Sequence, residues 1–355
     1  MDETFPKFHK IDQECSYCKI GKTRFIQAKQ KPNIHEYLDT TIKSQSKYQC
    51  ILGISGGVDS SYLAFKLKEM DIRVLLVHVD CGWDTNLASQ NIELIINQTG
   101  FDYYTMVPDW SLLKKMQISY LKSGVYNQDV PQDHAFVAGM YIAASKFKIK
   151  NMISGHSSAT ENIPNLWQHD AMDFSNLHSI ANSYEKNLDF TSYPYLNFFQ
   201  YYFWYPLIKK IKFYTPLDCL QYDKTKAINF LEKKGYVKYK DKHGESAFTK
   251  YFQNFYLPKK FGIHKIKTHL SSQIINGEIS RSQAKEIFKE HLQSLENDDH
   301  TEKYFYEKLD LSKEDYKKIM QSNSKQYYDF ANWDQLKKRA QIIKNIISPN
   351  KGHRE

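Results

Sequence analysis

The stretch SGGVDS at residues 55–60 carries the residue types that hold a phosphate group. It follows an apolar run over 48–54 that predicts a buried strand, and a run with helical spacing follows over 60–70. Glycines let the backbone approach an anion closely, and the first turn of a helix offers it unpaired N–H groups. Asp59 would repel that anion unless a cation lay between them, so we expect Mg²⁺ beside Asp59.

Two other phosphate-binding patterns fit the sequence less well. IGKT at 20–23 resembles the end of a Walker loop, but Ser16 stands where its first glycine belongs and no strand precedes it. Gly53, Gly56 and Gly57 are wrongly spaced for a dinucleotide-binding fold. A generic tight turn between a strand and a helix is the remaining alternative for 55–60.

Apolar runs and helical patterns alternate around this turn, and they indicate an α/β protein with a parallel sheet and helices on both of its faces. Further strands are expected at 72–80, 101–107 and 151–156, and further helices at 87–100, 109–124 and 133–149. Residues 1–45 form an N-terminal segment with a CxxC pair, 46–220 a nucleotide-binding domain, and 221–355 a mainly helical region.

The composition fits a soluble globular protein of 355 residues, with 41% hydrophobic residues and a net charge of +9. No apolar stretch reaches the roughly 20 residues that cross a bilayer, so we expect no membrane contact. The first residues lack a hydrophobic signal segment, which favours the cytoplasm. The positive charge could attract a polyanion or could serve solubility, because the basic residues are spread along the chain.

The stretch SGGVDS resembles the PP-loop of the ATP pyrophosphatase superfamily, whose members split ATP between its α and β phosphates. Over most of residues 10–290 the chain further resembles the N-acetyl sugar amidotransferases of bacterial surface-glycan biosynthesis. The strings that carry this resemblance are HVDCGWDTNLA (78–88), QDHA (132–135), ISGHSSATE (153–161), KHGESAFTKYFQNFYLPKKFG (242–262) and HLSSQI (269–274).

This resemblance implies an adenine nucleotide α-hydrolase-like fold that uses ATP and Mg²⁺ to convert an acetamido group of a nucleotide-linked sugar into an acetamidino group. The implied pathway is that of O-antigen or flagellin glycans of the pseudaminic or legionaminic type. The implied nucleotide contacts lie in the PP-loop and at the ends of two strands: Ser55, Gly56, Gly57, Val58, Asp59, Ser60, His78, Asp80, Gly82, Ser154, Gly155 and His156.

The same motifs imply contacts to the acceptor sugar. Glu161 or His134 could accept a proton from the attacking ammonium, and Asp59 completes the expected catalytic set. Cations of the later motif, among them Lys259, could hold the phosphates or carboxylate of the sugar nucleotide, or could form a solvated basic face. The expected acceptor contacts are Trp83, Asp133, His134, Thr160, Glu161, Lys242, His243, Glu245, Lys260 and His269.

Cys15 and Cys18 form half of a zinc site, because structural zinc commonly takes two CxxC pairs. Family members carry an earlier pair that this sequence does not show, and His9 could supply one ligand. Two non-catalytic thiols are the alternative. Cys81 stands where relatives often have Asn, and KIKTH at 265–269 replaces a more arginine-rich string.

No glutaminase signature is present in the sequence, so the resemblance implies ammonia from separate glutaminase and cyclase-like subunits similar to the histidine-biosynthesis pair. We expect the charged helices after residue 290 to dock those subunits. A tRNA-modifying PP-loop enzyme, either a thiolase or a lysidine-type ligase, is the alternative function. The chain shows no recognisable RNA-binding module, so no nucleic-acid partner is expected, and the intact SGGVDS argues against a non-catalytic interaction protein.

Overall fold

The computed structural model describes residues 1–11, 14–30, 47–157, 161–220, 222–239, 244–296 and 298–347. Three of the expected acceptor contacts, Thr160, Lys242 and His243, lie outside the described residues.

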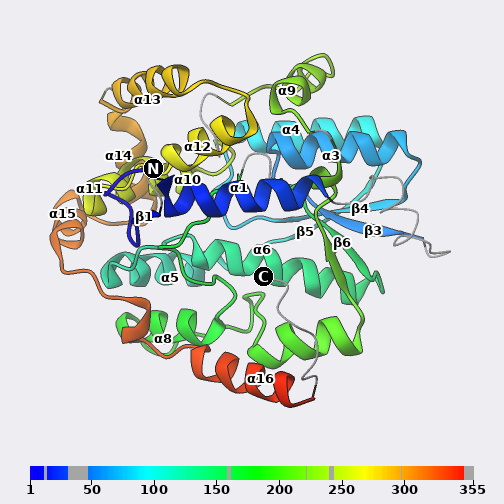
Figure 1. Ribbon diagram of the computed structural model, residues 1–355. Helices are drawn as coiled ribbons and strands as arrows, with labels where there is room; N and C mark the ends of the chain where they lie inside the picture. Colours follow the sequence, from blue (N-terminus) through cyan, green and yellow to red (C-terminus); the bar gives the residue numbers. More distant parts are fainter. Residues whose placement is uncertain are drawn as a thin grey trace.

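The centre of the molecule is a five-stranded sheet in the order β5-β4-β3-β6-β7, and every neighbouring pair in it is parallel (Figure 1). Among the five strands of this sheet, β3 comes first in sequence and lies in the middle, so the chain reverses its direction of winding next to it. Parallel strands need long crossovers, and helices supply them here. The predicted α/β fold class is therefore confirmed. The strands are β3 (Cys50–Gly53), β4 (Val74–Val79), β5 (Asp102–Met106), β6 (Asn151–Ile153) and β7 (Lys212–Tyr214).

Alternate side chains of the central strands enter two different cores, as the two-residue period of a strand requires. Leu52 and Leu76 pack with helices α3 (Val58–Glu69) and α4 (Asn86–Thr99) on one face. Ile51 and Leu75 pack on the other face against α6 (Val130–Lys146). Figure 1 shows α3 and α4 above the sheet and α6 below it. Because both faces are covered, these strands are apolar without a break.

The other elements surround this layered centre. The helices are α1 (Ser16–Lys29), α5 (Trp110–Ser123), α8 (Phe174–Tyr184), α9 (Lys224–Glu232), α10 (Ala247–Tyr251), α11 (Leu257–Phe261), α12 (Ile266–Asn276), α13 (Arg281–Glu296), α14 (Asp299–Lys308), α15 (Lys313–Gln321) and α16 (Asp334–Ile347). Two short strands, β1 (Lys10–Ile11) and β2 (Glu14–Cys15), pair antiparallel. The π-helical segments are η1 (Gln200–Ile208) and η3 (Phe252–Tyr256), and the 3₁₀ turns are η2 (Pro216–Cys219) and η4 (Tyr327–Asp329).

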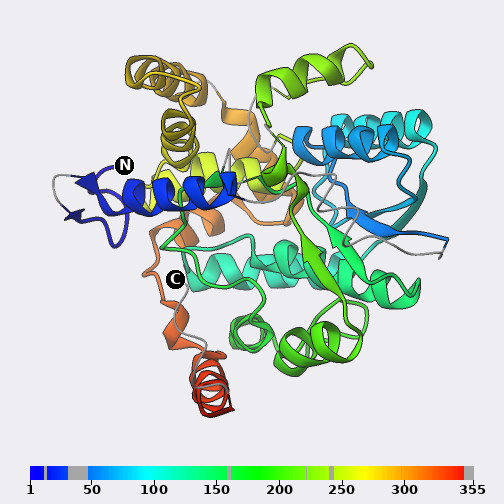
Figure 2. The ribbon, with the colours of Figure 1, turned by 45° about the vertical axis from the view of Figure 1, so that its right-hand side comes forward.

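The helices after residue 290 belong to the body of the protein. Phe305, Leu309, Tyr316 and Phe330 are buried in the same core as residues of α5 and α8. Figure 2 shows this part of the chain running along one side of the molecule, from α13 at one end to α16 at the other. Removal of these helices would expose that core, so they are part of the folded body of the protein.

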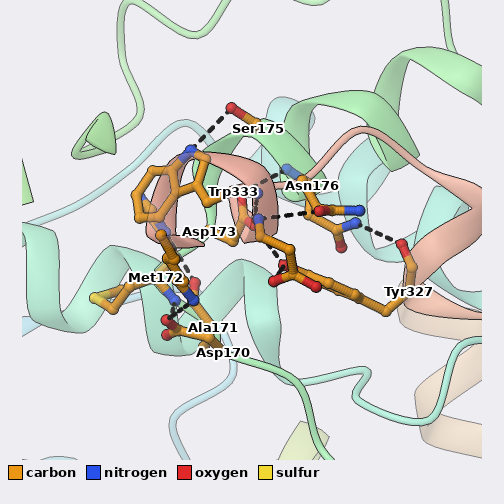
Figure 3. A network of polar contacts seen from close by, with 12 residues as sticks. Asp170, Ala171, Met172, Asp173, Ser175, Asn176, Tyr327 and Trp333 are labelled. Atoms are coloured by element: carbon orange, nitrogen blue, oxygen red, sulfur yellow. Dashed lines mark hydrogen bonds and ion pairs between the residues drawn. The ribbon is translucent and has the colours of Figure 1, made fainter. Parts of the chain in front are cut away.

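Asp173 ties the last part of the chain to α8 (Figure 3). Its carboxylate accepts hydrogen bonds from the Tyr327 hydroxyl and from the Trp333 backbone N–H, both at 2.6 Å, and it also caps α8 through the Asn176 N–H. The Asn176 amide donates to the Tyr327 carbonyl at 3.1 Å. A buried carboxylate with this many donors is fully satisfied, and the contacts fix the start of α16 against α8.

Candidate functional site

The carboxyl ends of β3, β4, β6 and β7 lie at one edge of the sheet, because these strands are parallel. The stretch SGGVDS follows β3, residues 80–82 follow β4, residues 154–156 follow β6, and residues 215–218 follow β7. In open α/β sheets this edge, next to a change in winding direction, is where ligands bind. The expected nucleotide contacts are therefore brought to a common edge.

The backbone of the SGGVDS turn is held by two tyrosines from beyond α9. The carbonyl oxygen of Gly56 accepts hydrogen bonds from the hydroxyls of Tyr236 at 2.9 Å and Tyr239 at 3.1 Å. Gly56 has a φ of +76°, and a Cβ there would come within 2.7 Å of the Ala88 carbonyl oxygen. The turn thus requires glycine both for its dihedral angle and for its contact with α4.

Gly57 caps α3, and no side chain caps the first N–H groups of that helix. The hydroxyls of Ser60 and Ser61 donate to the Gly57 carbonyl at 3.3 and 2.6 Å. A Cβ on Gly57 would lie 3.2 Å from both the Ser55 hydroxyl and a carboxylate oxygen of Glu245. The helix start therefore offers donors to an anion, and Glu245, predicted as an acceptor contact, faces this turn.

Asp59 lies in the first turn of α3, and one of its carboxylate oxygens accepts a hydrogen bond from the Tyr222 hydroxyl. Burial, and then the charge of Asp59, raises the pKa of Tyr222, so the tyrosine stays protonated and acts as the donor. Within the described part of the chain, the second carboxylate oxygen of Asp59 accepts no side-chain hydrogen bond. A magnesium ion shared with phosphate oxygens commonly uses one or two protein carboxylates, and Asp59 fits that role.

His78 supports the site from inside the protein. Its Nδ1 lies 2.7 Å from the Ile54 carbonyl oxygen and its Nε2 lies 2.6 Å from Asp84. Burial lowers the pKa of His78, but the hydrogen bond and charge of Asp84 outweigh burial, so the net shift is upward. Because both ring nitrogens bond to protein groups, the prediction that His78 contacts the nucleotide is corrected: it joins the ends of β3 and β4.

A carboxylate within the turn after β4 bonds to the backbone of that same turn. Asp80 accepts a hydrogen bond from the Gly82 N–H at 2.7 Å. Gly82 has a φ of +76°, and a Cβ there would come within 2.9 Å of the Trp110 ring. Asp80 and Gly82 therefore lie at the predicted edge and shape the backbone there.

The loop after β6 lies against the start of α3. A Cβ on Gly155 would come within 2.6 Å of the Ser60 nitrogen. The Ser154 hydroxyl accepts from the His156 N–H at 3.1 Å. His156 and Glu161 form an ion pair, with 2.6 Å between Nδ1 and the carboxylate. The motif residues after β3 and those after β6 are thus in contact, through Ser60 and Gly155.

A cleft of about 320 Å³ opens beside this pair. It lies between α1 and the segments that follow β6 and β7. Arg24 and Gln27 on α1 were not expected from the sequence, because a single arginine in a charged helix carries no local signal. The lining residues are Arg24, Gln27, Ala28, His156, Glu161, Asn162, Thr215 and Asp218.

One polar atom beside this cleft is buried without a hydrogen-bond partner among the described residues. The side chain of Asn162 is 1% exposed, and its Nδ2 donates to the Asn276 side chain at 3.2 Å. Its carbonyl oxygen has no hydrogen-bond partner within the described residues. A buried acceptor without a donor costs free energy, about 1–3 kcal/mol, which a bound N–H or O–H group would recover.

The later motif meets the β4 motif directly. Asp84 and Ser246 form an isolated antiparallel bridge. The Thr85 N–H donates to the Glu245 carbonyl, and the Ala247 N–H donates to the Trp83 carbonyl, both at 2.9 Å. These contacts join HVDCGWDTNLA to KHGESAFTK across about 160 residues of sequence and hold Glu245 over the phosphate-binding turn.

Three expected acceptor contacts lie elsewhere. Trp83 is buried among Trp110, Phe248 and Phe305, so it is a core residue. Lys260 donates to the carbonyls of Ile319, Met320 and Ser322 and thereby caps α15. His269 lies on α12, which packs against α1. The prediction for Lys260 is corrected, because its ammonium already bonds to three backbone carbonyls. The prediction for Trp83 is corrected because its ring is covered by other aromatic rings, although its Nε1–H has no hydrogen-bond partner among the described residues.

His134 is also a core residue, and its predicted role as a proton acceptor is corrected. Its Nδ1–H donates to the Ala171 carbonyl at 2.9 Å, and its Nε2 accepts from the Leu196 N–H at 3.1 Å. The side chain is fully buried, and burial lowers its pKa to about 4. A neutral imidazole with both nitrogens satisfied holds three segments together but has no site left for a substrate proton.

Asp133 lies in the first turn of α6, one helical turn after Asp129. Burial raises the pKa of Asp133 to about 7, and the charge of Lys265 opposes that rise. Burial, followed by the charge of Asp133, raises the pKa of Asp129, which accepts from the Thr249 hydroxyl at 3.3 Å. Thr249 and Lys265, which the sequence did not single out, bring the region after residue 244 to this carboxylate pair.

The structure brings no further metal ligands to Cys15 and Cys18 among the residues that it describes. The Cys15 sulfur accepts from the Cys18 N–H at 3.1 Å and so caps α1. The hydrogen bond with the Cys18 thiol lowers the pKa of Cys15 to about 6. Within the described ranges, no group of three or more His, Cys, Asp or Glu side chains could hold a metal ion. Cys81 is buried, and burial raises the pKa of its thiol, so it stays a packed, protonated side chain.

Across the part of the chain that the structure describes, no helix combines the length and the apolar character needed to cross a bilayer.

Comparison with known proteins gives one family and a set of similar structures. Residues 245–344 match the family described as LPS biosynthesis protein WbpG-like, C-terminal domain. No curated protein matches the chain.

The similar structures are distant. An NH3-dependent NAD synthetase from Campylobacter jejuni is 14% identical with a TM-score of 0.28; the match covers 41% of this chain and 58% of that one. A predicted subunit of a tRNA methyltransferase from Methanocaldococcus jannaschii is 17% identical with a TM-score of 0.30, covering 52% and 75%. An NMN synthetase from Francisella tularensis is 11% identical with a TM-score of 0.30, covering 66% and 93%. The chain thus spans little more than half of the NAD synthetase, and scores this low carry no argument about function.

The family match begins at Glu245, inside the string KHGESAFTK, and includes residues that contact the segment after β4 and bring Glu245 to the SGGVDS turn. Residues 245–344 of this chain are therefore similar to the C-terminal domain of the WbpG-like lipopolysaccharide-biosynthesis proteins.

Proposed function

We propose that this protein is an ATP-dependent amidotransferase that converts an acetamido group of a nucleotide-linked sugar into an acetamidino group. One observation carries the proposal: the family-matched segment brings Glu245 to the glycine-rich turn, where its carboxylate, like that of Asp59, would face a phosphate through a cation. The turn supplies a cradle for pyrophosphate, and the family is named for lipopolysaccharide biosynthesis. A cytoplasmic location follows from this reaction, because nucleotide sugars are made there.

The reaction proceeds in two steps. The acetamido oxygen bonds to the α-phosphorus of ATP, the bond from that phosphorus to pyrophosphate breaks, and pyrophosphate leaves. Ammonia then bonds to the imidate carbon, the carbon–oxygen bond breaks, AMP leaves, and one proton passes to a base. Magnesium, when bound beside Asp59, would neutralise charge on the phosphates. Gly56, Gly57 and the first N–H groups of α3 would hold the pyrophosphate.

The cleft beside His156 and Glu161 is our proposed acceptor site. Arg24 would face an anionic group of the sugar nucleotide, such as a phosphate or carboxylate. Gly155 links this cleft to Ser60 at the phosphate turn, so an acceptor there would lie near the α-phosphate.

Glu161 is the proposed base that takes the proton lost from the nitrogen when ammonia attacks. Its carboxylate lines the cleft and pairs with His156 at 2.6 Å. Since His134 is committed to the core, Glu161 is the remaining member of the two expected bases. We further propose that the ammonia comes from separate glutaminase and channel-forming subunits.

Isotope transfer tests the adenylation step. An N-acetylated nucleotide sugar labelled with heavy oxygen in its acetamido group is incubated with the protein, ATP, Mg²⁺ and ammonium. The proposal predicts that the label moves into the phosphate of AMP. Label that remains in the sugar, or is released into water while AMP stays unlabelled, would contradict the proposed reaction.

A further inference from the structure

A cluster of exposed aromatic and aliphatic side chains covers one flank of the molecule. It follows η1, the crossover segment that leads to β7 and lies at the same end of the molecule as α8 and α16, visible in green in Figure 1. Phe199, Leu207 and Ile208 are 59%, 61% and 61% exposed. We call these residues the aromatic patch: Phe199, Tyr202, Phe203, Trp204, Leu207 and Ile208.

The opposite side of η1 explains why this segment is ordered. Tyr205 is buried, and its ring and that of Tyr201 pack against Tyr141 of α6 at 5.1 and 6.0 Å between ring centroids. Tyr202, at the margin of the patch, is 37% exposed and also packs against the ring of the buried Trp333 at 6.1 Å. The segment is therefore anchored through one face, and its apolar outer face is a fixed surface and not a loose loop.

Pro206 shapes that outer face. Proline has no backbone N–H and widens or kinks a helix at its position. The Lys209 N–H accordingly donates to the Trp204 carbonyl five residues back, as in a π-helical turn. The wider turn brings Phe199, Phe203 and Leu207 to the same side, and the rings of Phe199 and Phe203 stack at 5.8 Å.

Lysines border the patch and no acidic residue interrupts it. Lys209, Lys210 and Lys212 are exposed at its end, and the Lys209 ammonium lies 5.6 Å from the Trp204 ring. Between Asp189 and Asp218 the sequence contains no Asp or Glu. The nearby Asp170 is paired with Lys337 at 2.8 Å, so its charge is compensated. An apolar, aromatic face with a basic border is complementary to an anionic, partly apolar surface.

We infer that the aromatic patch docks this protein on the surface of an anionic lipid bilayer. Tryptophan, tyrosine and phenylalanine rings suit the boundary between headgroups and acyl chains, and lysines reach the lipid phosphates from its edge. The sequence predicted no membrane contact because no stretch is long enough to cross a bilayer; docking on the surface needs no such stretch. This inference is independent of the proposed reaction.

Two other occupants fit the patch less well. A symmetric second copy would bring the lysine borders of both protomers together, and like charges would repel each other. A subunit that delivers ammonia would have to reach the cleft. However, η1 leads into the start of β7, at the edge of the sheet opposite to Thr215 and the phosphate turn. Docking through the patch would instead leave the cleft open to solution.

Vesicle binding tests the inference. The full chain is sedimented with vesicles of phosphatidylcholine alone and with vesicles that also contain phosphatidylglycerol. We expect binding to the anionic vesicles only, weakened by raised salt. Replacing Phe199 and Leu207 by Ser should lower binding at least about tenfold, and replacing Lys209, Lys210 and Lys212 by Gln should lower it by about fivefold for each lysine.

A matched control is available on α13, at the opposite end of the molecule (Figure 2). Lys285→Gln, Ile287→Ser and Lys289→Gln change exposed residues of the same types and should leave binding unchanged. Absence of binding to anionic vesicles, or equal loss in the control and the patch variants, would overturn the inference. A wild-type dimer that the Phe199 and Leu207 replacements convert to monomer would also overturn it, in favour of an interface between copies.

Discussion

Gly155, after β6, lies directly against Ser60 in the phosphate-binding turn: a Cβ on Gly155 would come within 2.6 Å of the Ser60 nitrogen and 2.8 Å of its Cα. Both neighbours are backbone atoms, so they cannot rotate away as a flexible side chain would. The contact fixes the acceptor cleft relative to the start of α3.

Gly155→Ala should therefore displace the phosphate turn. We expect ATP-dependent AMP formation to fall by about 10²-fold or more, because a shift of about 1 Å at a positioned site costs that much. Gly277→Ala serves as the control: Gly277 has a φ of +76°, but a Cβ there meets open space. The control should lose about 1 kcal/mol of stability and keep its activity. Full activity in Gly155→Ala would contradict the packing described.

Glu161→Gln tests the proposed base. The substitution keeps the size of the side chain and removes its ability to take a proton. We expect turnover with ammonium to fall by about 10²–10⁴-fold, with the KM for ATP unchanged. The measurement is the rate of product formation at saturating ATP and ammonium. Unchanged turnover would exclude Glu161 as the base.

Arg24→Gln tests the acceptor cleft. Loss of the guanidinium should raise the KM for the sugar nucleotide by about tenfold, since a hydrogen bond to a charged group contributes about 1.5–3 kcal/mol. Lys22→Gln on the same helix is the control, because Lys22 pairs with Glu14 and does not line the cleft. Equal KM values for the two variants would place the acceptor elsewhere.

His134 should matter for stability rather than for catalysis. Burial lowers its pKa to about 4, while the unfolded chain has its ordinary value of 6.5. Between these pH values the unfolded state binds a proton that the folded state does not. Stability should therefore fall as the pH drops from about 6.5 toward 4. The measurement is the free energy of unfolding in urea at several pH values across this range.

His134→Gln should flatten that pH dependence and cost about 1–3 kcal/mol at neutral pH, because a buried hydrogen bond is lost. The variant, once folded, should turn over at nearly the normal rate. A variant of normal stability with abolished turnover would restore His134 as a catalytic residue.

Asp133 should give the opposite pH dependence. Burial raises its pKa from 3.8 to about 7, so the folded state holds a proton that the unfolded state has lost. Its contribution to stability is present at low pH and is lost as the pH rises through about 7. Asp133→Asn should remove this loss, whereas Glu93→Gln, at an exposed position of α4, should not. If the free energy of unfolding changed with pH by the same slope in both variants, the assignment would be contradicted.

Local signals in the sequence predicted the centre of the fold well. The apolar runs that became β3, β4 and β6 are buried on both faces, and their continuous hydrophobicity reports that burial. Asp59, Gly155 and Glu161 belong to sequence motifs that follow the carboxyl ends of β3 and β6 in the structure. Arg24 and Asn162 carried no such signal, because a cleft formed by segments far apart in sequence leaves no periodic pattern.

The corrected predictions share a physical cause. His78 and His134 lie next to motif glycines and acids, but each is a buried imidazole with both nitrogens bonded to protein groups. Residue type and position along the chain do not reveal whether hydrogen bonds are already satisfied. Trp83 was expected at the rim, yet Phe248 and Phe305, from distant helices, cover it.

The central claim is most directly tested by measuring AMP and pyrophosphate released from ATP and Mg²⁺ with free ammonium. Diacetamido nucleotide sugars are compared with bulk tRNA as acceptors, and Asp59→Asn serves as the inactive control. We predict AMP only with a sugar, together with a product in which NH has replaced one oxygen. AMP that forms only with tRNA would contradict this account and identify an RNA-modifying enzyme.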